Sequence, residues 1–156
     1  YVILDCPPSL GLLTLNALVA ADEVLLPIQC EYYALEGVTQ LMRTIEAVRH
    51  AMNKELRLGS ILMTMFDGRT RLSTQVDEEV RTHFARETMS TRIPRSVRVS
   101  EAPSYSRSVL TYEPTSAGAV AYREAAAEFA KRHACDEHST NTSGVKHPDA
   151  SDTKKG

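Results

Sequence analysis

The sequence predicts an α/β fold, in which a mostly parallel sheet is covered by helices on both faces, followed by a disordered C-terminal tail. Short apolar runs alternate with longer helical patterns from residue 1 to about residue 133. The apolar runs are continuous, which is typical of parallel strands buried on both faces. Residues 134–156 are rich in Ser, Thr, Asn, Asp and Lys, with too few apolar side chains to offset the entropy of ordering. We therefore expect a folded domain over 1–133 and a disordered polar tail over 134–156.

The first elements are predicted from short apolar runs and helix signals. Tyr1–Leu4 is apolar throughout and predicts a fully buried strand, which ends at Asp5 and two prolines. A helix is expected over Leu10–Ala21 with Ser9 as its N-cap. The following elements are expected to be a strand over Glu23–Ile28, stopped near Pro27, and a long helix over Ala34–Met52, whose apolar residues recur every three or four positions.

The second half of the chain continues the alternation. In order, we expect a strand over Ser60–Phe66, a helix over Ser73–Arg86, a strand over Met89–Ile93, a short strand or extended segment over Val109–Tyr112, and a helix that Thr115 or Ser116 caps and that runs to about His133.

Length and composition exclude several classes of protein. The 156 residues suffice for one domain, and a net charge of −2 excludes a polycation that coats nucleic acid, although not a local basic patch. No apolar run is long enough to predict a transmembrane helix. Three cysteines without C-x-x-C spacing argue against a disulfide scaffold or a zinc site and fit a reducing cytosol. Because the chain opens on a buried-type strand without a basic leader, we expect it to be the C-terminal part of a longer protein.

Ligands of a parallel sheet bind beyond the carboxyl ends of its strands, which directs attention to the segments after each strand. Asp5 follows the first expected strand, and a carboxylate there can hold a magnesium ion beside a phosphate. A helix-capping or loop aspartate is the alternative. Pro7 and Pro8 stiffen the segment and Gly11 permits close approach, which suits either a phosphate-sensing loop or a rigid strand-to-helix turn.

Four segments in order resemble the ParA-type (Soj-like) chromosome- and plasmid-partitioning ATPases. They are Asp5–Leu18, which resembles the Walker B and switch II segment, and the stretches Pro27–Gly37, Thr64–Thr70 and Ile93–Ser104. The resemblance runs from Tyr1 to about Arg132. It implies a P-loop NTPase-like fold that is incomplete here, because the family's phosphate loop, a variant of G-x-x-x-x-G-K-[ST], and its switch I aspartate are absent from this sequence.

The resemblance also implies roles for individual residues, with ATP and Mg²⁺ as cofactors. Asp5 would be the Walker B carboxylate, near magnesium through water, and Gly11 would belong to switch II. The nucleotide would be lined by Pro7, Pro94, Arg95, Ser96 and Val97. Without the family, Pro94 reads as an ordinary strand-terminating proline. Without a phosphate loop, the isolated chain is expected to bind ATP poorly and to hydrolyse it negligibly.

Arginines supply a second signal. Nine arginines and no lysine lie between Arg57 and Arg107, and arginines on the loops of one sheet edge can track phosphates. Scattered arginines that solvate a surface are the alternative. By resemblance, Arg69 and Arg98 would bind DNA without sequence preference, with Arg71 a weaker candidate.

The function expected by resemblance is a cytoplasmic, nucleoid-associated switch. The intact protein would bind ATP, form a homodimer, bind duplex DNA nonspecifically, and be stimulated by a ParB-type partner. A MinD-like ATPase that positions cell division is disfavoured, because Cys135–Gly156 has no apolar face for a membrane. A non-catalytic α/β binding module is the alternative from another class. Cys6, Cys30, Tyr32 and Tyr33 are expected to be packing residues.

Overall fold

A three-stranded parallel sheet forms the centre of the molecule. The computed structural model describes residues 1–7, 9, 11–32 and 34–140. The strands are β1 (Glu23–Gln29), β2 (Arg57–Phe66) and β3 (Thr88–Pro94), and their order in the sheet is β1-β2-β3. Each strand pairs in parallel with the next. The predicted parallel α/β fold is thus confirmed, with β2 beginning at Arg57 rather than at Ser60.

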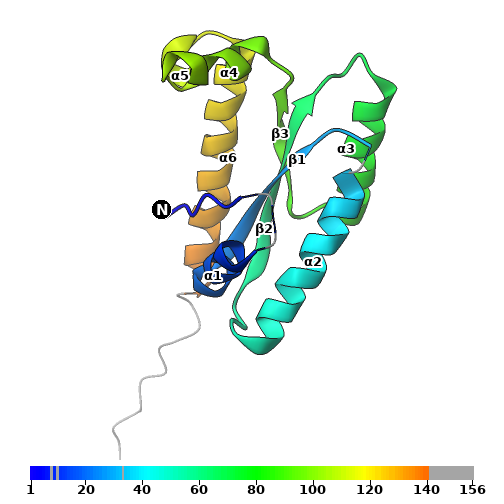
Figure 1. Cartoon of the computed structure of the whole chain (residues 1–156), viewed down its shortest axis with the longest axis vertical. Helices are drawn as coiled ribbons and strands as arrows, with labels where there is room; N and C mark the ends of the chain where they lie inside the picture. Colours follow the sequence, from blue (N-terminus) through cyan, green and yellow to red (C-terminus); the bar gives the residue numbers. More distant parts are fainter. Residues whose placement is uncertain (8, 10, 33, 141–156) are drawn as a thin grey trace, which may run out of the picture.

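Helices cover both faces of this sheet, as predicted. In Figure 1, α6 lies on one side of the strands and α2 and α3 lie on the other. Adjacent residues of β2 pack toward opposite faces: Ile61 and Met63 join the core with α2 and α3, whereas Leu62 joins the core with α6. The helical elements are α1 (Leu12–Ala20), α2 (Ala34–Ala51), α3 (Arg71–His83), α4 (Val97–Glu101), the 3₁₀ turn η1 (Ala102–Tyr105), α5 (Val109–Tyr112) and α6 (Ala117–Thr140).

A separate apolar cluster attaches α1 to α2. Its buried members are Leu18, Ile45, Val48 and Leu56. Burial of one such aliphatic side chain contributes about 1.5–3 kcal/mol. The side-chain Nδ2 of Asn53 also donates to the carbonyls of Leu18, Val19 and Ala21, at 3.2, 3.1 and 2.8 Å, and so satisfies acceptors left open at the end of α1.

The predicted opening strand is wrong. Tyr1–Leu4 has no secondary structure, and the Tyr1 side chain is 83% exposed. A strand needs backbone partners on a neighbour, and the three described strands pair only with one another. The segment lies beside α6 instead, with the Tyr1 ring 5.9 Å from the ring of Phe129 (Figure 1).

Two further local predictions need correction, and a third is confirmed. Val109–Tyr112 is the helix α5, because its flanking Ser108 carbonyl accepts from the Thr111 and Tyr112 amides and closes a helical turn. Gly11, rather than Ser9, is the N-cap of α1 and has no side chain with which to cap it. For the last helix, Ser116 is the N-cap as predicted, since its hydroxyl accepts from the Ala119 amide at 3.2 Å.

The last helix is also longer than predicted. α6 continues past His133 to Thr140, so residues 134–140 are helical rather than a disordered tail. Extending a formed helix costs little per residue, and no proline or glycine interrupts the sequence between His133 and Gly144. The rest of the predicted tail, 141–156, lies outside the described residues.

Side chains of α6 form hydrogen bonds with backbone groups in and beside a bulge of β3. Between the pairs Ile61↔Thr88 and Met63↔Arg92, β3 advances four residues while β2 advances two. The Glu128 carboxylate of α6 accepts from the amides of Ser90 (2.7 Å) and Thr91 (2.8 Å) in the bulge. One helical turn later, Arg132 donates to the carbonyls of Arg86, Glu87 and Thr88, at 3.0, 3.2 and 2.9 Å.

Candidate functional site

The loops at the carboxyl ends of the three strands form the candidate site. Because the strands are parallel, Gln29, Phe66 and Pro94 end at the same edge of the sheet. The Arg95 amide donates to the Phe66 carbonyl at 2.9 Å, so the segment after β3 is fixed to the end of β2. The Cys30 amide donates to the Thr64 carbonyl at 3.0 Å and fixes the segment after β1 in the same way.

The segment Pro94–Val97 turns from β3 into α4. Ser96 is the N-cap of α4 with extended backbone, but its side chain does not cap the helix. Val97 begins α4 and is 70% exposed. The Arg95 guanidinium reaches the Glu31 carboxylate at 3.3 Å, across the edge of the sheet. Pro94–Val97, which are predicted to line the base of the nucleotide, therefore form one continuous segment that is open to solvent on one side. This is the base-side segment.

Gly118 of α6 sets how closely α4 can approach. A Cβ atom on Gly118 would lie 2.5 Å from Cγ2 of Val99 and 3.3 Å from Oγ of Ser96. A carbon–carbon contact of 2.5 Å essentially never occurs, so a larger residue would require Val99, and α4 with it, to shift away from α6. The position of the segment before α4 thus depends on a glycine in a different helix.

The loop after β2 carries Arg69 in an ion pair within the loop. Both Asp67 carboxylate oxygens accept from the Arg69 guanidinium, at 2.9 and 2.8 Å, and Oδ1 also accepts from the Arg69 amide at 3.1 Å. The Arg69 side-chain hydrogen bonds lower the pKa of the Asp67 carboxyl to about 2. The Arg69 side chain is 90% exposed.

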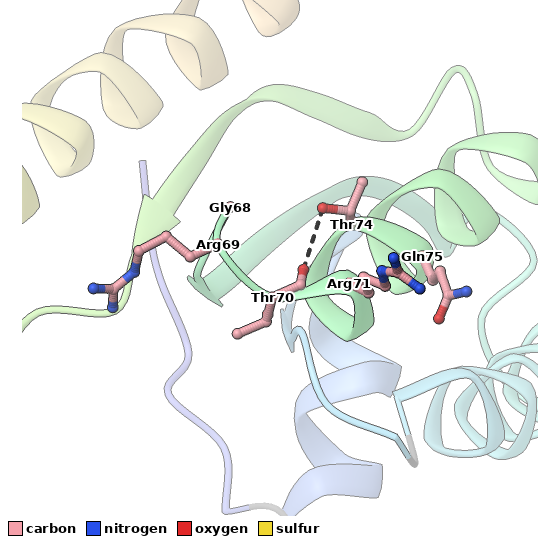
Figure 2. A pocket seen from close by; sticks show the side chains of 6 residues that line it. All are labelled: Gly68, Arg69, Thr70, Arg71, Thr74 and Gln75. Carbon is pink, nitrogen blue, oxygen red and sulfur yellow. Dashed lines mark hydrogen bonds between the residues drawn. The ribbon is translucent and has the colours of Figure 1, made fainter.

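Arg69 and Arg71 lie at opposite sides of this loop. Thr70 is the N-cap of α3 and accepts from the Ser73 amide, at 3.3 Å, and Arg71 is the first residue of the helix. The two arginines and four neighbouring residues line a shallow recess of about 250 Å³. Figure 2 shows the Arg69 and Arg71 side chains pointing away from one another, so the recess does not close around a single ligand.

Arg98 is paired in a manner similar to Arg69. Its guanidinium donates to the Glu101 carboxylate, three residues on in α4, at 2.9 Å. Arg71 and Arg107, by contrast, have no carboxylate partner within the part of the chain that the structure describes. The ion pairs that Glu31, Asp67 and Glu101 form with these arginines were not predicted from the sequence, although the spacings of two and three residues to Arg69 and Arg98 indicated two of them.

Two other arginines serve the core rather than a ligand. Asp77 of α3 is 4% exposed and accepts from Arg81 at 3.0 Å and from Arg92 at 2.7 Å. Burial raises the pKa of the Asp77 carboxyl, but the hydrogen bonds from Arg92 and Arg81 outweigh burial and lower it overall. The Arg92 guanidinium also lies over the Phe66 ring, 5.3 Å from its centroid. Arg81 and Arg92 are therefore bound in the fold.

The segment with the predicted metal and switch residues takes no part in these hydrogen bonds and ion pairs. Asp5 and Pro7 are exposed, and Asp5 makes no hydrogen bond or ion pair to any described residue. The Thr14 hydroxyl donates to the Ser9 carbonyl at 2.7 Å and shapes the start of α1. A Cβ on Gly11 would meet only Ser9 Oγ, at 3.8 Å, so the fold leaves room beside Gly11. No hydrogen bond or ion pair between described residues joins Asp5 to the loops of Arg69 or Arg95.

The predicted packing residues divide. Cys30 is buried, and burial raises the pKa of its thiol to about 11, which suits a core residue. Cys6 is exposed, because the segment that holds it has no strand partner, and Tyr32 is 77% exposed. The prediction that Cys6 and Tyr32 are packing residues is therefore wrong. Tyr33 lies outside the described residues.

Comparison with known proteins supports the resemblance seen in the motifs. Residues 1–58 match AAA_31, a family described as an AAA domain. The chain is 52% identical over 130 residues to the sporulation initiation inhibitor protein Soj of Bacillus subtilis, and the matched stretch covers 83% of this chain and 51% of that protein. It is 51% identical over 132 residues to the chromosome partitioning protein ParA of Myxococcus xanthus, with 85% of this chain and 47% of the relative covered.

Solved structures also resemble the chain. A crystal structure titled as cobyrinic acid a,c-diamide synthase from Mycobacterium smegmatis with bound ADP and magnesium matches with a TM-score of 0.61 and 36% identity, over 88% of this chain and 46% of that one. A second structure under that name, with an ATP analog and magnesium, has a TM-score of 0.60. In the described residues, no helix is long and apolar enough to cross a membrane.

The chain spans about half the length of the curated relatives that it matches. Over that half, the identity is about as high to the Soj protein of Thermus thermophilus, at 53% over 131 residues. The order of motifs, the parallel sheet and the identity to these relatives all point to the same family. Over the residues that it shares with them, this chain is thus similar to the ParA/Soj partitioning ATPases.

Proposed function

We propose that this chain is the part of a DNA-partitioning ATPase that senses the nucleotide state and faces DNA. The observation that carries the proposal is the Arg95 amide bond to the Phe66 carbonyl, 2.9 Å long, which holds the base-side segment next to the Arg69 loop. A change at the nucleotide would then act directly on the loop that bears an exposed arginine. The names of the relatives, chromosome partitioning proteins, favour DNA as the other ligand.

The residues of this chain fit one side of an ATP–Mg²⁺ site. Asp5 has a carboxylate without a described protein partner, and such a group can hold a hydrated magnesium ion. The space beside Gly11 allows a phosphate to approach the backbone there. Pro94, Arg95, Ser96 and Val97 would line the base, and Pro7 would stiffen the segment after Asp5. When bound, the metal would neutralise charge on the phosphates.

The remaining parts of the proposal concern the whole protein. We propose a cytoplasmic, nucleoid-associated protein that dimerises with ATP, binds duplex DNA without sequence preference and is stimulated by a ParB-type partner. Arg69 and Arg98 would contact phosphates, with Arg71 contributing less. The synthase named for the similar solved structures is the second candidate, and it is less favoured because its identity is 36% rather than 52%.

ATP turnover tests the nucleotide side. In the full-length protein, Asp5→Ala is expected to abolish ATP hydrolysis, measured as phosphate release, because the metal loses its carboxylate. Glu36→Gln, at an exposed position of α2, serves as a matched control and should leave turnover unchanged. Normal turnover in Asp5→Ala would show that this aspartate is structural only.

DNA binding tests the other side. The full-length protein is expected to bind duplex DNA only with ATP, and Arg69→Ala combined with Arg98→Ala should weaken binding equally for unrelated DNA sequences. Each lost phosphate contact should reduce the slope of log affinity against log salt by about 0.9. An unchanged affinity and slope in the double variant would remove these arginines from the DNA surface.

A further inference from the structure

Two of the arginines assigned to DNA are each bound to a carboxylate of their own segment. Asp67 holds the Arg69 guanidinium by two hydrogen bonds, at 2.9 and 2.8 Å, and Glu101 holds that of Arg98 at 2.9 Å. Arg71 differs, because it is exposed and pairs with no carboxylate among the described residues. A guanidinium that is already bound to a carboxylate offers less attraction to a DNA phosphate.

We propose that Asp67 and Glu101 restrain Arg69 and Arg98, so that these arginines bind DNA at full strength only after phosphates displace the two carboxylates. The inference rests on the proposed function and deepens it by naming residues that set the DNA affinity. Phosphodiester and carboxylate compete for the same planar donor fork. The carboxylates therefore lower the resting affinity without touching DNA.

The backbone keeps Asp67 in place as a competitor. Its Oδ1 atom accepts from the Arg69 amide at 3.1 Å, and its own amide donates to Ser73 Oγ at 3.4 Å. The carboxylate therefore cannot follow the Arg69 side chain when that side chain swings toward a phosphate. Because the Arg69 hydrogen bonds keep the pKa of Asp67 at about 2, the carboxylate stays charged wherever DNA binding is measured.

The substitution Asp67→Asn tests the restraint with little change of shape. The Asn side-chain oxygen can still accept from the Arg69 amide, so the turn is retained while the charge is removed. An exposed ion pair of this kind is worth so little that the expected rise in affinity for duplex DNA is about two- to five-fold. Glu101→Gln should give a rise of the same order through Arg98.

Removal of any negative charge near DNA also raises affinity, so the test needs a second background. Affinities are measured by fluorescence anisotropy with a labelled duplex, in the full-length protein with ATP. Asp67→Asn is compared in the otherwise unchanged protein and in the Arg69→Ala variant. The restraint predicts that the rise disappears when Arg69 is absent. An additional Arg71→Ala background, which leaves the ion pair intact, should retain the rise.

The outcomes distinguish failure of the restraint from failure of the proposed DNA surface. A rise of equal size with and without Arg69 would mean that only overall charge matters, and it would overturn the restraint. Unchanged or weaker binding in Asp67→Asn would also overturn it, since the carboxylate would then orient Arg69 for DNA. If Arg69→Ala with Arg98→Ala leaves binding intact, the DNA surface of the proposed function fails, and the restraint fails with it.

Discussion

The carboxylate of Glu128 is expected to stabilise the fold through the bulge of β3. Its Oε1 accepts from the Ser90 amide and from Arg132, at 2.7 and 2.9 Å, and its Oε2 accepts from the amide and hydroxyl of Thr91, both at 2.8 Å. In Glu128→Gln, the new NH₂ group faces a backbone N–H donor in either orientation. One amide of the bulge is then left unsatisfied, and a charged acceptor is lost.

The size of the effect follows from these contacts. An amide left without its acceptor at this half-buried position and the loss of a charge-assisted hydrogen bond together cost about 2–3 kcal/mol. For a protein of this length that corresponds to a fall in Tm of roughly 4–12 °C. The free energy of unfolding is measured by urea titration at neutral pH. Glu124→Gln, four residues earlier on an exposed position of α6, is the matched control and should change it by less than about 0.5 kcal/mol.

The pH dependence supplies the stricter check. Burial raises the pKa of the Glu128 carboxyl, but the Ser90 and Thr91 hydrogen bonds outweigh burial, and the pKa falls from 4.5 to about 2. Because the folded pKa lies below the unfolded one, the stabilisation is complete above about pH 4.5 and is lost as the pH falls toward 2. The difference between Glu128→Gln and the unchanged protein should therefore shrink over that range. Equal stabilities of Glu128→Gln and the unchanged protein at neutral pH, or a difference between them that does not change with pH, would refute the reasoning.

Two other predictions concern the core and the candidate site. Gly118→Ala places a Cβ 2.5 Å from Val99, so we expect the free energy of unfolding to fall by about 1–3 kcal/mol from overpacking, and DNA binding to weaken as α4 shifts. Ala117→Gly is the comparison at the neighbouring position. Unchanged stability in Gly118→Ala would show that Val99 moves aside freely. Iodoacetamide at mildly alkaline pH should label Cys6, which is exposed, and leave Cys30 unlabelled in the native state, because burial raises the pKa of the Cys30 thiol to about 11; peptide mapping by mass spectrometry reads this out, and fast native labelling of Cys30 would contradict its place in the core.

Periodic apolar patterns were sufficient to predict the central elements. The stripe of α2 and the apolar runs of β1, β2 and β3 are local properties of the sequence, and each appears within a few residues of its expected bounds. Tyr1–Leu4 has an equally strong pattern, but a strand also depends on backbone partners elsewhere. α5 fails for a related reason: β-branched Val109 and Thr111 favour extended structure weakly, and a single turn closed by Ser108 decides the outcome.

The candidate site was predictable only in part. The position of the loops follows from strand direction, which is why the segments after β2 and β3 lie at the same edge of the sheet, as expected. Charge pairing does not follow in this way. Arg81 and Arg92 converge on Asp77 from two elements, and their positions in the sequence do not indicate that they are bound to it. The role of Glu128 was likewise hidden, because a glutamate on a helix reads as a solvated residue until a bulge is found beneath it.

The contacts of α6 on β3 also bear on how molecules of this protein can associate. An incoming strand from another copy would seek free amide and carbonyl groups along Thr88–Thr91. It would find the amides of Ser90 and Thr91 and the Thr88 carbonyl already bound to side chains of the helix. Such a strand could add to the sheet on this side only by first detaching α6, so the helix protects this margin against edge-to-edge aggregation.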